Sequence, residues 1–204
     1  MKIKWTPCLL IFALAAMILG GCGTEEISRD SGNSIIEDSQ ESSEIPVSSP
    51  APAPEAELPG PVTFEAQDID GNSVSSDIFP GVKLTMINVW ATYCNPCLRE
   101  MPDLGELAGE YEATDFQLIG IVSDVPEGSK ESVIEEAKRL IEQTNAVYPH
   151  LLLNESLYNA LLTEVTAVPT TFFLDKEGNI LNTVVGSMSK EDWKETIDAL
   201  LEEL

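Results

Sequence analysis

Basic side chains are scarce in this sequence. Its 204 residues include 11 Lys and Arg against 35 Asp and Glu, which gives a formal net charge of −24. Because the phosphates of nucleic acids would repel such a chain, these numbers argue against a DNA or RNA partner. The hydrophobic content of 43% is nevertheless sufficient for a packed core, and the length allows one ordinary domain with additional segments.

Ligands for soft metals are also scarce, since the chain has one histidine and four cysteines. Cys8 lies in an N-terminal apolar segment and Cys22 at the end of it, which leaves Cys94 and Cys97 as candidates for chemistry. A zinc site needs four ligands, and only His150 remains to join the pair. We therefore expect no metal, and we interpret His150 as a structural residue.

The N-terminus lacks an apolar run long enough to span a bilayer. Two lysines precede the run Leu9–Leu19, which has the length of a signal-peptide core. The run ends in Leu19-Gly20-Gly21-Cys22, which resembles the bacterial lipobox, in which the cysteine is lipidated and becomes the new first residue. We expect residues 1–21 to be a signal peptide and Cys22 to carry a lipid. The alternative is an ordinary signal peptide with an incidental cysteine.

Apolar side chains are few in residues 22–61, where serine, proline and acidic residues dominate. Such a segment cannot offset its ordering entropy by burying apolar surface, so we expect a disordered tether. The Pro-Ala run at 50–54 should be extended and stiff. The tether would hold a domain off the membrane or serve as a linker of no particular length. A folded domain is expected over residues 62–204.

Strand and helix patterns alternate from residue 62 onward. The expected strands are 62–66, 73–75, 83–90, 116–122, 151–153, 170–174 and 180–185. The expected helices lie around 104–111, over 129–144, over 157–162 and from 189 to the C-terminus. Ser189 with Asp192 forms a capping-box pattern at the start of the last helix. This order predicts an α/β fold with a mixed central sheet and helices on both faces.

The strongest chemical signal is the segment Trp90-Ala91-Thr92-Tyr93-Cys94-Asn95-Pro96-Cys97, between a buried strand and a helix. Residues three apart in the first turn of a helix share a face, so the two sulfurs can bond. The free N–H groups of a helix N-terminus favour negative charge, which lowers the pKa of the Cys94 thiol. The resulting thiolate is the species that attacks disulfides.

Two other interpretations compete for this pair. A permanently closed structural disulfide would be a poor staple, because a loop of two residues adds little entropic stabilisation. A peroxiredoxin usually has a threonine three residues before its reactive cysteine, and Ala91 holds that position here. A redox-active Cys94–Cys97 pair is therefore favoured.

The segment from Trp90 to Cys97, followed by Glu100-Met101-Pro102, resembles the active site of the TlpA/ResA branch of the thioredoxin superfamily. The resemblance runs from about Phe64 to the C-terminus and includes Val168–Phe172 and Asp175–Gly178. It implies a thioredoxin-like fold with an N-terminal β-hairpin extension. It also implies that the redox-active Cys94–Cys97 pair itself carries the electrons, with no bound cofactor.

The resemblance further implies roles for individual residues. Cys94 matches the attacking cysteine and Cys97 the resolving one. Glu100 matches an acid that could take and return the proton of Cys97, with a solvated helix acid as the alternative. Asn88 stands where thioredoxins proper carry a buried acid, which makes Glu100 the better proton relay. The residues expected to position a substrate are the cis-proline Pro169 and Val168, Trp90, Tyr93 and Pro96.

By the same resemblance, the chain would perform thiol-disulfide exchange outside the cytoplasm, anchored to a membrane. It would reduce exported proteins, such as apocytochrome c during cytochrome c maturation, or a methionine sulfoxide reductase in an antioxidant role. A membrane thiol-electron carrier of the CcdA or DsbD type would supply electrons. The alternatives are an oxidase that donates its disulfide and a lipoprotein binding module whose disulfide is static.

Overall fold

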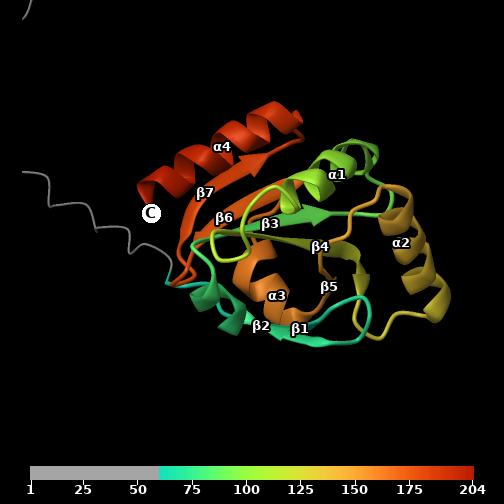
Figure 1. Ribbon diagram of the computed structural model, residues 1–204. Helices are drawn as coiled ribbons and strands as arrows, with labels where there is room; N and C mark the ends of the chain where they lie inside the picture. The colour runs from blue at the N-terminus through green and yellow to red at the C-terminus, as the bar shows by residue number, and fades with distance from the viewer. Residues whose placement is uncertain (1–59) are drawn as a thin grey trace, which may run out of the picture. The chain divides into compact units, whose positions relative to one another are not determined.

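Residues 60–204 are described by the computed structural model, in which a central sheet is surrounded by helices (Figure 1). The expected signal peptide, the lipidation site Cys22 and nearly all of the tether lie outside the described residues. Within residues 60–204, no helix combines the length and the apolar character needed to cross a membrane.

The central sheet is mixed, as the sequence predicts. Its strands are β3 (Leu84–Trp90), β4 (Phe116–Pro126), β5 (His150–Leu153), β6 (Thr170–Asp175) and β7 (Ile180–Val185). They lie in the order β5-β4-β3-β6-β7, with β3, β4 and β5 mutually parallel and β6 antiparallel to both of its neighbours. The hairpin of β1 (Glu65–Gln67) and β2 (Ser73–Ser75) precedes this sheet and forms a separate two-stranded one.

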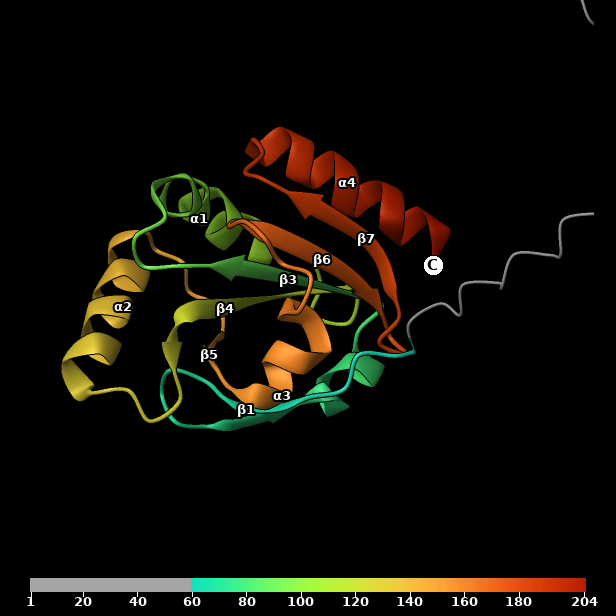
Figure 2. The ribbon, with the colours of Figure 1, turned by 180° about the vertical axis from the view of Figure 1, so that it is seen from behind.

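Helices cover both faces of the sheet. The helices are α1 (Asn95–Ala108), α2 (Glu131–Gln143), the short α3 (Glu155–Leu157) and α4 (Lys190–Glu203). A wide helical turn, Tyr158–Leu162, continues α3, and a 3-10 turn, Ser76–Gly81, follows the hairpin. In both views α1 and α4 lie on one face of the sheet, and α3 and the hairpin lie on the other (Figures 1 and 2).

Strand β3 supplies both hydrophobic cores, because alternate side chains of a strand point to opposite faces. Met86 and Trp90 pack with residues of α1, α2 and α4. Ile87 and Val89 pack with residues of α3 and the N-terminal hairpin. All seven residues of the strand are buried, which explains its near-continuous apolar sequence. By this alternation, Asn88 faces α1 between Met86 and Trp90.

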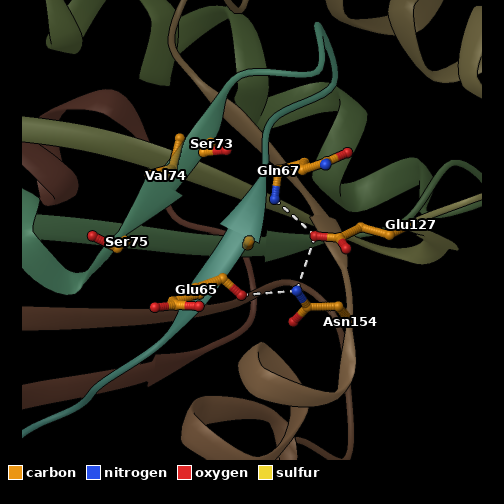
Figure 3. Close-up of a pocket in the computed structure, with 8 residues that line it drawn as sticks. Glu65, Gln67, Ser73, Val74, Ser75, Glu127 and Asn154 are labelled. Atoms are coloured by element: carbon orange, nitrogen blue, oxygen red, sulfur yellow. Dashed lines mark hydrogen bonds between the residues drawn. The ribbon is translucent and has the colours of Figure 1, made fainter.

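The N-terminal hairpin is tied to the end of β4 by a small polar cluster (Figure 3). Glu127 Oε1 accepts hydrogen bonds from Gln67 N at 2.7 Å and from Asn154 Nδ2 at 2.9 Å. Asn154 Nδ2 also donates to Glu65 O at 2.8 Å. These bonds anchor an extension that is too short to be stable alone.

Candidate active site

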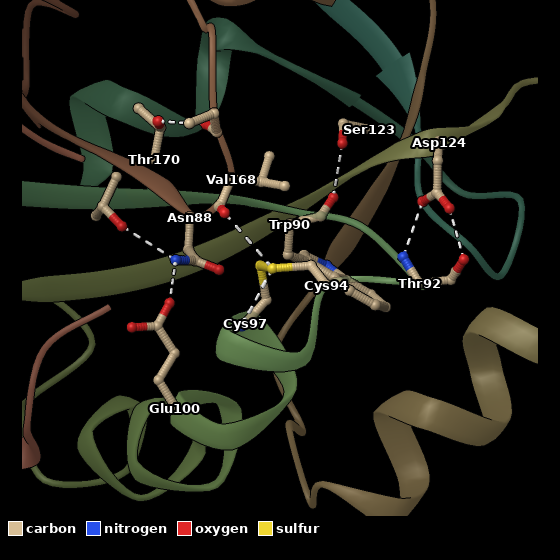
Figure 4. The surroundings of a disulfide bond; sticks show 12 residues. Asn88, Trp90, Thr92, Cys94, Cys97, Glu100, Ser123, Asp124, Val168 and Thr170 are labelled. Carbon is tan, nitrogen blue, oxygen red and sulfur yellow. Dashed lines mark hydrogen bonds between the residues drawn. A yellow bond between two sulfur atoms is a disulfide. The ribbon is translucent and has the colours of Figure 1, made fainter. Parts of the chain in front are cut away.

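The two cysteines meet where β3 ends and α1 begins (Figure 4). Cys94 is the N-cap of α1, and its Sγ accepts a hydrogen bond from Cys97 N at 3.2 Å. Cys94 and Cys97 form a disulfide, with their Cα atoms 5.3 Å apart. The sequence prediction that both sulfurs lie on one face of the first helical turn is confirmed.

The loop before β6 lies against the disulfide. The Val168–Pro169 peptide bond is cis, as expected. Val168 O is 3.6 Å from Cys94 Sγ. In the disulfide this sulfur has no proton to donate, so the contact becomes a hydrogen bond only when Cys94 is a thiol.

Only one sulfur of the pair is near the surface. Cys94 is 5% exposed, whereas Cys97 is fully buried. Tyr93, immediately before Cys94, is 74% exposed, and Pro96 is partly exposed. A partner protein can therefore reach the disulfide only from the side of Cys94.

The loop between β3 and α1 is held by residues at the end of β4. Thr92 donates to Asp124 twice, from N to Oδ1 at 3.0 Å and from Oγ1 to Oδ2 at 2.5 Å. Ser123 Oγ donates to Trp90 O at 2.9 Å. Sequence reasoning missed Ser123 and Asp124. What could have identified them is their place near the carboxyl end of β4. The carboxyl ends of parallel neighbours such as β3 and β4 share one edge of the sheet.

Trp90 supports the site from beneath. It is fully buried, and its Nε1 donates to His150 Nδ1 at 3.1 Å. His150 Nε2 in turn donates to Ala146 O at 3.0 Å, which fixes the neutral tautomer. Burial lowers the pKa of His150 to about 4. His150 is thus placed as a structural residue, and Trp90, which was expected to position a substrate, can act only through the residues above it.

Glu100 is buried rather than solvated, with 3% of its surface exposed. Its Oε1 accepts from Asn88 Nδ2 at 3.1 Å. Its Oε2 accepts from Met188 N at 3.3 Å and from Trp193 Nε1 at 3.4 Å. Desolvation raises the pKa of Glu100 to about 7, although these hydrogen bonds act in the opposite direction. The carboxyl can therefore exchange a proton near neutral pH.

A mostly apolar groove of about 250 Å³ opens beside Cys94. Tyr93 and Tyr158 belong to its rim, and Leu162, Val165 and Val168 contribute apolar surface. Val168 lines the groove and also contacts Cys94 through its carbonyl oxygen, so the groove lies next to the residues around the reactive sulfur. Within the described residues, no group of three or more histidine, cysteine or acidic side chains could hold a metal ion.

Comparisons with known proteins agree with this geometry. Residues 52–183 match the AhpC/TSA family. The thiol-disulfide oxidoreductase ResA of Halalkalibacterium halodurans is 26% identical over 139 residues, which is 68% of this chain and 74% of the relative. The thioredoxin-like protein YneN of Bacillus subtilis is 29% identical over 135 residues, 66% of this chain and 75% of the relative.

Two solved structures resemble the fold. A thiol:disulfide interchange protein of the thioredoxin family from Chlorobium tepidum TLS has a TM-score of 0.61 and 25% identity, covering 72% of this chain and 99% of that one. The pneumococcal exposed lipoprotein thioredoxin Etrx1 from Streptococcus pneumoniae strain TIGR4 has a TM-score of 0.55 and 27% identity. That match covers 67% of this chain and 98% of the pneumococcal chain.

Proposed function

The chain belongs to the AhpC/TSA family and is a ResA-like thiol-disulfide oxidoreductase with a thioredoxin-like fold, and from this premise we propose that it reduces disulfides of exported proteins outside the cytoplasm. The observation that carries the proposal is the Cys94–Cys97 disulfide, of which only Cys94 reaches the surface, beside an apolar groove. A static disulfide would not need this access.

The reaction starts from the reduced pair. The Cys94 thiolate attacks one sulfur of a substrate disulfide, and the other substrate sulfur leaves as a thiolate that takes up a proton. Cys97 then loses its proton to Glu100 and attacks Cys94 Sγ, which releases the second substrate sulfur. Two electrons pass from the pair to the substrate, and the Cys94–Cys97 disulfide closes.

The start of α1 favours the attacking thiolate. Cys97 N–H points at Cys94 Sγ from 3.2 Å, and the N-terminal end of the helix dipole adds positive potential. Negative charge on Cys94 is thereby stabilised in the reduced protein. Cys97, deeper in the core, has no such exposure and acts as the resolving thiol.

Substrate binding is assigned to the groove beside Cys94. An apolar side chain next to the substrate cysteine would enter between Tyr93 and Val168, with Pro169 and Pro96 bordering the disulfide. Trp90 holds the loop in place from beneath through His150. No further cofactor is needed, because the reduced Cys94–Cys97 dithiol carries both electrons.

The N-terminal sequence and one structural relative support the proposed compartment. The signal peptide of residues 1–21 and a lipid on Cys22 would place the domain outside the cytoplasm on a membrane, and one structural relative is named as an exposed lipoprotein. Apocytochrome c or a methionine sulfoxide reductase are the proposed substrates. A membrane thiol-electron carrier of the CcdA or DsbD type would return the pair to its reduced state.

Trapping tests the proposal. A Cys97→Ala variant cannot resolve the mixed disulfide, so it should accumulate exported proteins bound through Cys94. A Cys94→Ala/Cys97→Ala variant is the matched control and should trap none. If the single variant also traps none, the chain is a binding module and the proposal fails.

The reduction potential separates the reductase from an oxidase. A value near that of thioredoxin, roughly −270 mV, supports the reductase, whereas one near −120 mV supports an oxidase that donates its disulfide. The potential is obtained by equilibrating the chain with dithiol and disulfide mixtures and counting its free thiols.

A further inference from the structure

The side-chain amide of Asn88 lies between Glu100 and the disulfide. Asn88 is fully buried on the face of β3 that packs against α1, between Met86 and Trp90. Its Nδ2 donates to Glu100 Oε1 at 3.1 Å and to Thr171 Oγ1 at 3.0 Å. Figure 4 shows the opposite end of the amide, Oδ1, pointing toward the two sulfurs.

Asn88 Oδ1 has no hydrogen-bond donor among residues 60–204, although it is buried. The orientation of the amide follows from its neighbours, because only the NH₂ end can donate to an ionised carboxylate at Glu100. With Glu100 ionised, above its raised pKa of about 7, the unpartnered acceptor therefore lies on the sulfur side. A buried polar atom without a partner is rare and costs stability, so its presence calls for a physical reason.

Reduction of the disulfide creates the missing donor. Two electrons and two protons convert the disulfide to two thiols, and Cys97 is fully buried in the disulfide form. Its S–H is a weak donor that water cannot reach. Cys94 has Val168 O at 3.6 Å as an acceptor, whereas for Cys97 the candidate acceptor is Asn88 Oδ1, which points toward the sulfurs in Figure 4.

We propose that Asn88 Oδ1 accepts a hydrogen bond from the Cys97 thiol in the reduced protein, and that Asn88 thereby favours the reduced over the oxidised pair. The proposal rests on the proposed function only in that Cys97 alternates between disulfide and thiol. In the oxidised state the amide carries an unsatisfied acceptor, and in the reduced state it does not. The cost of the unsatisfied acceptor is thus present only in the oxidised state, which shifts the redox equilibrium toward the two thiols.

Glu100 strengthens this hydrogen bond through the amide. When its carboxylate accepts from Nδ2, the amide is polarised and Oδ1 becomes a better acceptor. Asn88 would thus connect the redox sulfur to the proton-exchanging carboxyl. This gives a function to the residue at the position where thioredoxins proper have an acid.

Infrared spectroscopy tests the hydrogen bond directly. The S–H stretching band of Cys97 is isolated as the difference between the reduced Cys94→Ala and Cys94→Ala/Cys97→Ala chains. It should be shifted to low frequency by hydrogen bonding, and it should move to the position of a free thiol when Asn88→Ala is added. Asn88→Asp, which keeps an oxygen at this place, should retain the low frequency. Thr171→Val, the matched control, removes a partner of Nδ2 and should leave the band in place.

The redox equilibrium gives a second readout. Relative to the wild type, Asn88→Ala should shift the equilibrium with dithiothreitol about tenfold toward the chain's disulfide, as expected for relieving one buried unsatisfied acceptor. Thr171→Val should change it less than about twofold. A shift in the same direction should remain when Asn88→Ala is made in a Glu100→Gln background. It should be smaller, because the polarising carboxylate is absent, but not zero, because it acts on Cys97 and not on the protonation of Glu100.

A Cys97 band at the free-thiol position in the Cys94→Ala chain, or one that Asn88→Ala does not move, overturns the proposal. An equilibrium shift that vanishes in the Glu100→Gln background overturns it as well. Neither readout requires a protein substrate. A chain that equilibrates with dithiothreitol but traps no exported protein would refute the proposed function and leave this inference standing.

Discussion

Replacing Glu100 by glutamine should change how the stability of the protein depends on pH. Glu100 has an ordinary pKa of 4.5, which burial raises to about 7 in the folded protein. Below pH 4.5 the carboxyl is protonated in both the folded and the unfolded chain. Between pH 4.5 and about 7 the unfolded chain loses the proton while the folded chain keeps it. The free energy of unfolding contributed by Glu100 therefore falls as the pH rises through this window, and it is constant above it.

The size of this effect follows from the two pKa values. A difference between 4.5 and about 7, at 1.36 kcal/mol for each pH unit, corresponds to about 3 kcal/mol. Glutamine cannot titrate, so the Glu100→Gln chain lacks this loss. The NH₂ group of the glutamine would face one of the donors of Asn88, Met188 and Trp193, but the cost of that mismatch is independent of pH. The stability of the variant relative to the wild type should thus rise by about 3 kcal/mol between pH 4.5 and 7.

Urea unfolding of the disulfide-bonded chain measures this difference. The free energy of unfolding is obtained for both chains at several pH values from 4.5 to 8 under non-reducing conditions. Comparing the two chains at each pH cancels the contributions of the other acidic residues. Glu135→Gln is the matched control, because Glu135 is exposed on α2 and has no ion pair within the described residues. It controls for the loss of one negative charge from the surface of the chain.

A Glu100→Gln difference that is flat across this window would refute the reasoning. It would mean that the folded protein pays no desolvation cost at Glu100 and that the carboxyl is ionised well below neutral pH. Glu100 would then be unable to take the proton of Cys97 in the proposed mechanism.

Other substitutions test the support of the site. The free energy of unfolding of His150→Gln should rise by about 3 kcal/mol relative to the wild type as the pH falls from 6.5 to 4, since burial lowers the pKa of His150 to about 4. Equal urea unfolding curves for the two chains would contradict this. Asp124→Ala should lower the free energy of unfolding by about 1–3 kcal/mol at pH 7, because the N–H and hydroxyl of Thr92 lose their acceptors. An unchanged value would contradict the role of Asp124 in holding the loop between β3 and α1. Gly120→Ala should lower the melting temperature measured by circular dichroism, since its Cβ would lie 2.2 Å from His150 Nδ1; an unchanged value would contradict this contact.

The strand and helix pattern could be predicted because the hydrophobic periodicity is strong. Residues 83–90 form a near-continuous apolar run, and β3 is buried on both faces as that run indicates. Ser189 accepts from Asp192 N at 3.2 Å, as its place before the last helix predicts. The cysteine pair could be predicted because its two members are three residues apart and the chemistry is local.

The supporting contacts could not be predicted because they join residues far apart in the chain. Asn88 and Thr171 are 83 positions apart and meet only because β3 and β6 are paired in one register. Asp124 reaches Thr92 across 32 positions for the same reason, as neighbouring strands end at one edge of the sheet. Nothing in the sequence around Asn88 shows that one end of its amide lacks a partner.

The two buried titrating groups beneath the site affect stability in opposite directions. The Glu100 contribution falls with rising pH from 4.5 to about 7, whereas the His150 contribution rises from about 4 to 6.5. Between pH 4.5 and 6.5 the two contributions therefore oppose each other. Each single variant leaves the contribution of the other group unopposed. The buried Glu100 carboxyl thus makes the fold less sensitive to pH in this range than it would without His150.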